Sequence, residues 1–148
     1  MSEPALTIRR ARREDVPAIV ALYADDMLGA ARETPDALDC YYDVFDRVDG
    51  ELLVGEMDGV VVATMQLTMI QQLSAQGGKV AQIESVRVAR ALRSHGLGAI
   101  LIRDAIERAR AAGCARVQLT SNQSRKEAHR FYERLGFVAS HTGFKLAL

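Results

Sequence analysis

The sequence lacks the features that define several classes of protein. Its 2 cysteines, Cys40 and Cys114, lie far apart and form no CxxC or Cys/His pattern, so a zinc site is not expected. No apolar run is long enough to cross a bilayer, and we expect no membrane partner. A formal net charge of zero argues against a nucleic-acid binder held by bulk electrostatics. Internal repeats, low-complexity tracts and linkers are also missing.

What is present suits one ordinary domain over residues 1–148. Hydrophobic residues make up 49% of the chain and charged residues 26%, enough for a sizeable core with a polar surface. The start, Met1-Ser2-Glu3-Pro4, has neither a basic region nor a hydrophobic stretch, so a secretory signal is not expected. The cytoplasm is therefore the expected location.

The charges are unevenly distributed along the chain. Acidic side chains crowd residues 25–49, whereas basic side chains dominate residues 87–134. Most of these charges are typical of solvated helix faces. The asymmetry nevertheless suits an anionic cofactor on one side and a cationic acceptor on the other.

Hydrophobic periodicity predicts alternating strands and helices, and hence an α/β (α+β) fold. A hairpin signal, Asp58-Gly59, joins two strands, and a loop containing Gly29 separates the first two helices. Ser124 and Glu127 form a capping box at the start of the last helix. The expected strands are 6–9, 51–57, 60–70, 80–88, 116–121 and 137–146, and the expected helices begin near residues 15, 38, 96 and 124.

The most informative segment is a strand, a tight turn and a long helix between residues 86 and 112. The turn contains Gly96 and Gly98, and glycines let an anion approach the backbone closely. A helix start also has free N–H groups and partial positive charge. The segment therefore predicts an anion site made mainly of main chain.

Two common phosphate motifs fit this turn poorly. A P-loop needs Lys-Ser or Lys-Thr after its second glycine, but Ala99-Ile100 follows Gly98. The dinucleotide fingerprint GxGxxG is incomplete, and it usually follows the first strand of a domain. A nucleotide-binding α/β protein is one alternative, and it ranks behind the two that follow below.

Arg93-Ser94-His95-Gly96-Leu97-Gly98 resembles the R/Q-x-x-G-x-G/A pyrophosphate loop of the GNAT superfamily of N-acetyltransferases. Further similarity lies in the strand before this loop, in Asn122, in Phe131-Tyr132 and in Leu135-Gly136-Phe137, so it covers nearly the whole chain. The resemblance implies a single GNAT-type domain. Its mixed, mostly antiparallel sheet is splayed in the middle and flanked by about four helices.

The resemblance also implies acetyl-CoA as the cosubstrate, with no metal. Backbone groups of Val86 and Val88 would pair with the pantetheine arm as an added strand does. Asn122 would reach the pantetheine or a bridging water. The pyrophosphate would bind the backbone of residues 94–99 with added charge from Arg93; the residues concerned are Arg93, Ser94, His95, Gly96, Leu97, Gly98 and Ala99.

Two residues are candidates for catalysis, and each has a simpler structural explanation. Tyr132 occupies the position where the family's tyrosine points at the CoA sulfur, although it could be a core residue beside Ala128 and Leu135. Strand alternation places Glu84 on one face with Gln82, Val86 and Val88, where apolar neighbours would make it a general base. An exposed or ion-paired glutamate is the alternative. A bulge in this strand, which is common in the family, would also change the face that Glu84 shares.

The implied reaction is direct attack of a primary amine on acetyl-CoA in a ternary complex. The acceptor would be a small molecule or a peptide amino group. A homodimer is possible, because sheets of the family often pair through their C-terminal strands. The rival from another class is a non-catalytic acetyl-CoA sensor or interaction module of the same fold.

Overall fold

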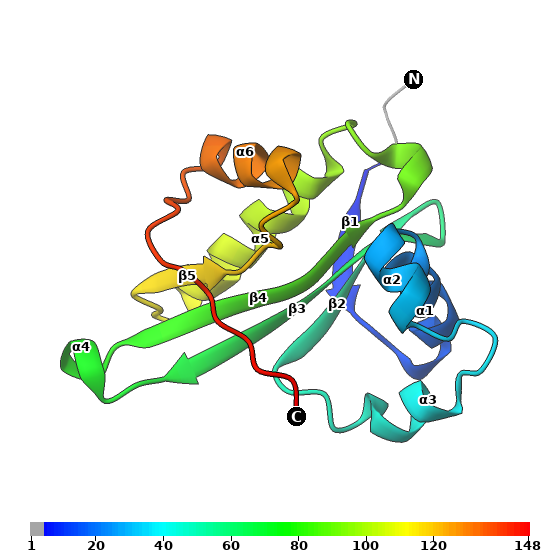
Figure 1. Ribbon diagram of the computed structural model, residues 1–148, viewed down its shortest axis with the longest axis horizontal. Coiled ribbons are helices and arrows are strands. Elements are labelled where there is room, and N and C mark those ends of the chain that lie inside the picture. The colour runs from blue at the N-terminus through cyan, green and yellow to red at the C-terminus, as the bar shows by residue number, and fades with distance from the viewer. Residues whose placement is uncertain (1–4) are drawn as a thin grey trace. The chain divides into compact units, whose positions relative to one another are not determined.

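The computed structural model describes residues 5–148, which form two compact units. The first unit ends at Gln118, and the second spans Leu119–Leu148 (Figure 1). Residues 1–4, on which the expected lack of a secretory signal rests, lie outside the described residues. No helix within residues 5–148 has both the length and the apolar character needed to cross a membrane.

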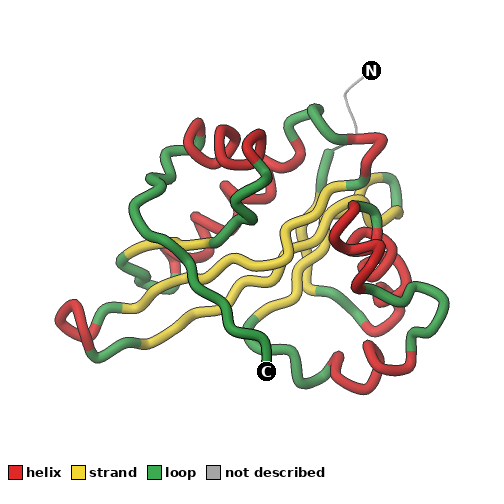
Figure 2. The backbone as a smooth tube through the Cα atoms, viewed as in Figure 1, coloured by secondary structure: helices red, strands yellow, loops and turns green. Residues whose placement is uncertain are grey.

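A five-stranded sheet in the order β1-β2-β3-β4-β5 forms the centre of the fold (Figure 2). The first four strands pair antiparallel. Lys79 and Gln82 of β4 bond with Ala115 and Gln118, and these contacts advance in the same direction along both segments, so the sheet is mixed as predicted. The splay expected in the sheet involves both units and stays a prediction. The strands are Thr7–Arg10 (β1), Glu51–Met57 (β2), Val60–Gln71 (β3), Lys79–Val88 (β4) and Arg116–Leu119 (β5).

The described residues contain six α-helices, two more than the sequence predicts. The additional ones are short: α2 carries Gly29, in the segment expected to be a loop, and α4 is a single turn containing two left-handed residues. The helices are Val16–Ala24 (α1), Met27–Arg32 (α2), Asp39–Phe45 (α3), Ser74–Gly77 (α4), Leu97–Ala111 (α5) and Lys126–Arg134 (α6).

Helix α2 forms because Asp26 caps it and Gly29 lets it approach α1. The Asp26 carboxylate accepts a hydrogen bond from the Gly29 amide at 2.5 Å. A Cβ on Gly29 would lie 1.7 Å from the Tyr23 carbonyl oxygen, so only glycine fits there. The sequence signal of an isolated glycine therefore marked close packing and not a loop.

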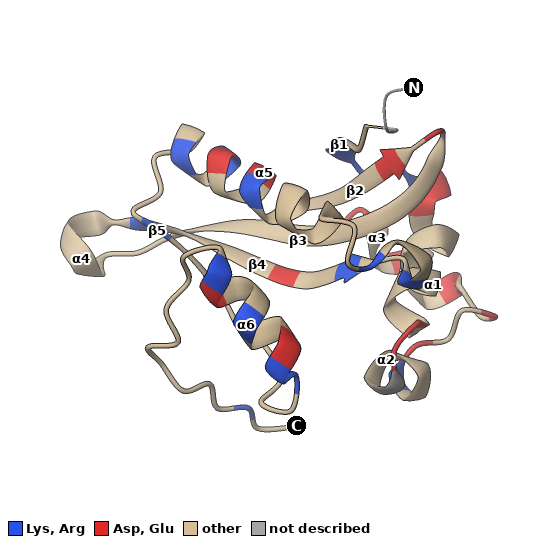
Figure 3. Cartoon of the chain, turned by 90° about the horizontal axis from the view of Figure 1, so that it is seen from above, with Lys and Arg blue, Asp and Glu red and all other residues tan. Residues whose placement is uncertain are grey.

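The core lies between β3 and β4 and the helices on either side of them. Figure 3 shows α5 and α2 on opposite sides of these strands. Helix α5 contributes Leu101, Ile102 and Ala105, all with no measurable exposure. The apolar face predicted for β3 is confirmed, since its buried members include Ala63, Met65 and Leu67. Burial of these residues is the main source of stability.

A bulge interrupts β4 shortly before the glycine turn. Gln66 of β3 pairs with Glu84, whereas Thr64 pairs with Arg87, so β4 has one extra residue at this point. Ser85 adopts a left-handed conformation with φ +54°, which is unusual for a residue with a side chain. The bulge changes which side chains share a face of the sheet.

The predicted last strand, 137–146, does not form in the second unit. Residues 137–148 adopt neither helix nor strand, and Val138, Phe144 and Leu146 are at least 81% exposed. The predicted capping box is also wrong: α6 begins at Lys126, and no side chain caps it.

Candidate active site

The glycine turn at the end of β4 has the backbone shape that the sequence predicts. Gly96 is left-handed, with φ +78°, and it is the residue that caps α5. A Cβ placed on Gly96 would meet no protein atom within 4 Å, so the space beside this backbone is open. The requirement for glycine is therefore conformational, and the open space can admit a ligand.

The N-terminus of α5 provides main-chain donors for an anion. No side chain caps this helix of 15 residues, and the Ile100 amide donates to the Gly96 carbonyl at 3.2 Å. In this geometry the amides of Leu97, Gly98 and Ala99 have no intrahelical acceptor. Together with the helix dipole, they fit a phosphate or pyrophosphate group.

The side chain of Arg93 does not extend freely from the loop. Its Nε donates to the Val88 carbonyl at 3.2 Å, and its Nη2 lies 3.9 Å from a carboxylate oxygen of Asp25. Ser94 is left-handed, with φ +70°, and the Nδ1 of exposed His95 lies 3.0 Å from the Arg93 carbonyl oxygen. The structure thus adds a restraint on Arg93 that the sequence did not predict.

The carbonyl groups of Val86 and Val88 each have an arginine partner. Arg87 donates to the Val86 carbonyl at 2.9 Å, as Arg93 does to that of Val88. A carbonyl oxygen has two lone pairs, so each can accept a second hydrogen bond. Val88 pairs with Ala63 in the sheet, and both valines are half-buried.

Glu84 is exposed and lies on a different face from the one predicted. Directly paired residues of antiparallel strands share a face, so Glu84 lies on the same face as Gln66, Thr64 and Arg87. Val88 lies on the opposite face, because the bulge reverses the alternation. The prediction that Glu84 shares a face with Val86 and Val88 among apolar neighbours is therefore wrong.

In the second unit, Tyr132 is held between two aromatic rings. Its centroid lies 5.1 Å from that of Phe131 and 5.8 Å from that of Phe137, both in edge-to-face arrangements. Such contacts fix the orientation of a ring. The Tyr132 carbonyl also accepts from the Phe137 amide at 3.1 Å, which closes the helix end.

Asn122 forms a local turn before α6, and this turn replaces the predicted capping box. Its side-chain oxygen accepts from both the amide and the hydroxyl of Ser124, at 2.9 and 2.7 Å. The Ser124 hydroxyl therefore bonds back to Asn122 and does not cap the helix. The amide nitrogen of Asn122 remains the group that can donate to a ligand.

A cluster of charges beside β4 was missed by the sequence analysis. Arg87 pairs with Asp26 at 3.3 Å, and Arg90 and Arg93 both pair with Asp25. The partners are separated by more than 60 residues, so only the three-residue spacing of the arginines marks them in the sequence.

Tyr23 lies beside this cluster but is not suited to proton transfer. Burial raises its pKa to about 12, against the opposing effects of Arg87 and a hydrogen bond with Thr64. The phenol therefore stays protonated at ordinary pH.

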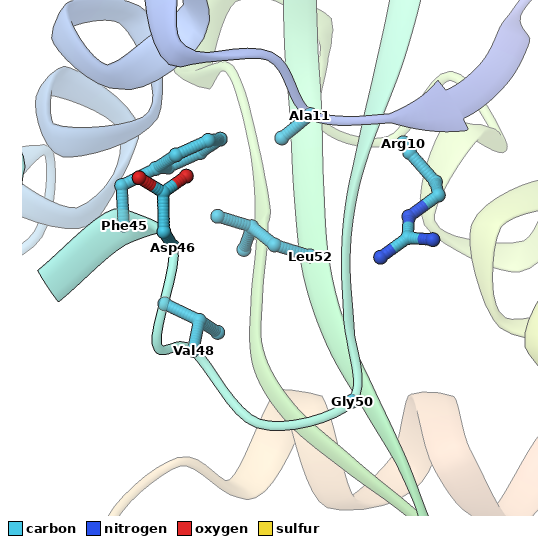
Figure 4. Close-up of a pocket in the computed structure, with 7 residues that line it drawn as sticks. All are labelled: Arg10, Ala11, Phe45, Asp46, Val48, Gly50 and Leu52. Carbon is cyan, nitrogen blue, oxygen red and sulfur yellow. The ribbon is translucent and has the colours of Figure 1, made fainter.

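A pocket of about 170 Å³ lies elsewhere in the first unit, at the start of β2. Figure 4 shows Phe45, Leu52 and Ala11 pointing toward one another at its centre. None of the predicted site residues lines it. The lining residues are Arg10, Ala11, Phe45, Asp46, Val48, Gly50 and Leu52.

The predicted site residues fall into two groups. Glu84, the valines and the loop belong to the first unit, whereas Asn122 and Tyr132 belong to the second. Within residues 5–148, no three His, Cys, Asp or Glu side chains are grouped to hold a metal ion. The first group contains both the main-chain donors at the start of α5 and the exposed carboxylate of Glu84.

Residues 16–137 match the Acetyltransferase (GNAT) family. An aminoalkylphosphonate N-acetyltransferase from Salmonella typhimurium is 33% identical over 94 residues, which are 64% of this chain and 58% of that protein. A probable glucosamine 6-phosphate N-acetyltransferase from Oryza sativa subsp. japonica is 36% identical over 78 residues, covering 53% and 45%. The matched part of the chain thus spans about half the length of these curated relatives.

The fold is also found in solved structures. A transcriptional regulator from Bacillus halodurans C-125 is 39% identical, with a TM-score of 0.93, and the comparison covers 97% of this chain and 100% of that one. The family match extends over the bulged strand, the glycine turn and α6, which are the parts that the sequence resemblance used. The chain therefore belongs to the GNAT family of acetyltransferases.

Proposed function

We propose that the protein transfers the acetyl group of acetyl-CoA to a primary amine. The observation that carries this proposal is the left-handed Gly96 at the start of α5, which no side chain caps and which follows the bulged strand β4 in the chain. Its free amides suit the pyrophosphate, with Arg93 adding positive charge. Backbone groups of Val86 and Val88 would hold the pantetheine arm, and Asn122 would donate to it directly or through water.

The proposed reaction takes place in a ternary complex without an acetyl-enzyme. The amine nitrogen attacks the thioester carbonyl carbon, and the carbon–sulfur bond then breaks. Tyr132 donates a proton to the departing CoA thiolate, and the amine loses its proton to a base. Main-chain amides near the β4 bulge would stabilise the carbonyl oxygen as it gains negative charge.

Glu84 is the proposed base, acting through a water molecule, since its side chain is exposed. Replacing Glu84→Gln keeps the shape but removes the proton acceptor, so kcat should fall by about 10²-fold and the acidic limb of the pH–rate profile should flatten. Steady-state kinetics across pH measure this effect. An unchanged limb and unchanged kcat would exclude Glu84 as the base.

A small-molecule amine is the proposed acceptor class. The two curated relatives are an aminoalkylphosphonate N-acetyltransferase and a probable glucosamine 6-phosphate N-acetyltransferase, and both names specify small amines that carry an anionic group. The acidic segment of this chain favours a cationic acceptor instead. A screen of both kinds of amine, read by release of free CoA thiol, distinguishes them.

A second candidate is an acetyl-CoA-binding regulator without catalysis. It is favoured by the similarity to the transcriptional regulator from Bacillus halodurans C-125, whose whole chain is covered. This alternative retains the cofactor cradle but predicts no thiol release with any amine. It also predicts that Tyr132→Phe leaves the function of the protein unchanged, including its binding of acetyl-CoA.

A thermal-shift titration tests the proposed cofactor. A ligand at one hundred times its dissociation constant adds about 2.7 kcal/mol of stability, which raises the Tm of a domain of this size by roughly 5–11 °C. We expect this rise with acetyl-CoA and none with NAD, ATP or GTP. A rise with a nucleotide alone would contradict the proposal and reassign the turn at Gly96 to nucleotide binding.

We also propose that two copies associate through their C-terminal segments. Val138, Phe144, Leu146 and Leu148 are almost fully exposed. They lie at even positions, so pairing of the segment as a strand in a dimer would place them on one face. Sedimentation equilibrium should give twice the mass of one chain, and Phe144→Ser should give the single mass. Lys145→Gln, at an odd position, is the matched control. A single mass for the unaltered protein would contradict a homodimer.

A cytoplasmic location stays a prediction.

A further inference from the structure

Three arginines around the cofactor loop are anchored to two adjacent aspartates. Arg87, Arg90 and Arg93 follow one another at intervals of three, and their partners Asp25 and Asp26 lie between α1 and α2. Figure 3 shows basic residues at the end of β4 close to acidic residues beside α1 and α2. The loop that should bind the pyrophosphate is therefore tied to the helices that precede it.

Asp25 contacts two of the three arginines, Arg90 and Arg93. Its carboxylate lies 3.4 Å from the Nε of Arg90 and 3.9 Å from the Nη2 of Arg93. Its carbonyl oxygen accepts from the same two guanidinium groups, at 3.0 and 3.4 Å. A single residue thus restrains both arginines that precede the glycine turn.

Arg93 bridges two groups that matter for the proposed cofactor. One side of its guanidinium contacts Asp25, and the other donates to the Val88 carbonyl, which lies in the strand proposed to hold pantetheine. The Arg93 side chain is 43% exposed and that of Asp25 is 37% exposed, so the ion pair is partly solvated. Such a pair contributes little stability and can be exchanged for a stronger anionic partner.

We propose that Asp25 is a positioning residue that holds Arg93 in a resting position and competes with the pyrophosphate of acetyl-CoA for its guanidinium. This inference rests on the proposed function. Cofactor binding transfers Arg93 from Asp25 to the pyrophosphate and releases the Val88 carbonyl for the pantetheine arm. The α1–α2 junction then loses one of its contacts with the loop.

The proposed competition predicts that removing the Asp25 charge strengthens acetyl-CoA binding. Asp25→Asn removes the carboxylate charge but retains the shape and the backbone carbonyl, so Arg93 is held less tightly. Acetyl-CoA should then bind about two- to fivefold more tightly, the range expected for a partly exposed ion pair. The KM for acetyl-CoA should fall by a similar factor while kcat is unchanged, because Asp25 touches neither the amine nor the thioester.

A double-mutant cycle with Arg93→Gln tests the assignment. Arg93→Gln should weaken acetyl-CoA binding, and adding Asp25→Asn to that variant should change the affinity by less than about 1.5-fold. Asp36→Asn, which removes the same charge from an exposed loop, is the matched control and should have no effect. All affinities are measured by calorimetry at one ionic strength, since screening alters such pairs.

The outcomes separate this inference from the proposed function. Unaltered protein that fails to bind acetyl-CoA would contradict the proposed function, and this inference with it. Normal binding together with weaker or equal binding by Asp25→Asn would overturn only the competition. A gain that persists in the Arg93→Gln background would overturn the role of Arg93. A gain that depends on Arg93, with a lower KM and an unchanged kcat, would support the proposal.

Discussion

Tyr132→Phe should lower kcat by about 10²-fold or more while leaving the affinity for acetyl-CoA within about twofold. The substitution removes only the phenolic oxygen, which is the proposed proton donor to the CoA thiolate. The ring should keep its place, because its edge-to-face contacts with Phe131 and Phe137 do not need the hydroxyl. Single-turnover kinetics with a saturating amine measure the chemical step directly.

Tyr41→Phe is a matched control for loss of a phenol. The Tyr41 hydroxyl accepts from the Thr34 amide at 2.8 Å and contacts Glu33 at 3.1 Å, so it also takes part in hydrogen bonds. This variant should retain kcat within about twofold. If Tyr132→Phe also retained full single-turnover activity, the tyrosine would be a packing residue and another group would protonate the thiolate.

Gly96→Val should weaken acetyl-CoA binding by about 100-fold or more. The valine side chain would enter the open space beside the α5 amides, where the pyrophosphate should lie. Hydrogen bonds to a charged group are worth about 1.5–3 kcal/mol each, so losing two of them corresponds to this factor. Calorimetric titration with acetyl-CoA measures the loss.

Gly59→Val separates the effect on the ligand from backbone strain. Gly59 also has φ +78°, and a Cβ there also meets no atom within 4 Å, but it lies in the β2–β3 hairpin turn. Both valine variants should lose about 1–2 kcal/mol of stability from the left-handed conformation. Only Gly96→Val should lose affinity, and equal affinities in both variants would show that the pyrophosphate does not approach Gly96.

Local signals in the sequence predicted most of the elements that build the site. The Asp58-Gly59 turn, the alternation in β3 and the glycines before α5 all act within a few residues, and the structure confirms the elements they indicate. The order of the predicted strands and helices along the chain indicated the fold class. The predictions at Ser124 and at residues 137–146 failed, because a cap or a strand also depends on which partner is close enough to bond.

The face that Glu84 occupies was decided only by strand pairing. Simple alternation placed Glu84 with Val86 and Val88, but the extra residue at Ser85 reverses the alternation beyond it. A bulge is a mismatch between two strands. The sequence of one strand therefore cannot reveal where it occurs.

The sequence by itself determined the glycine turn, the helix that follows it and the family to which they point. These features depend on backbone conformations that short segments specify through glycine, helix caps and periodicity. Only the tertiary structure decided that Arg93 rests on Asp25 and the Val88 carbonyl, and that Gly29 packs against α1. Contacts between residues distant in sequence depend on how the chain folds in three dimensions, and a pattern of neighbouring residues carries no record of them.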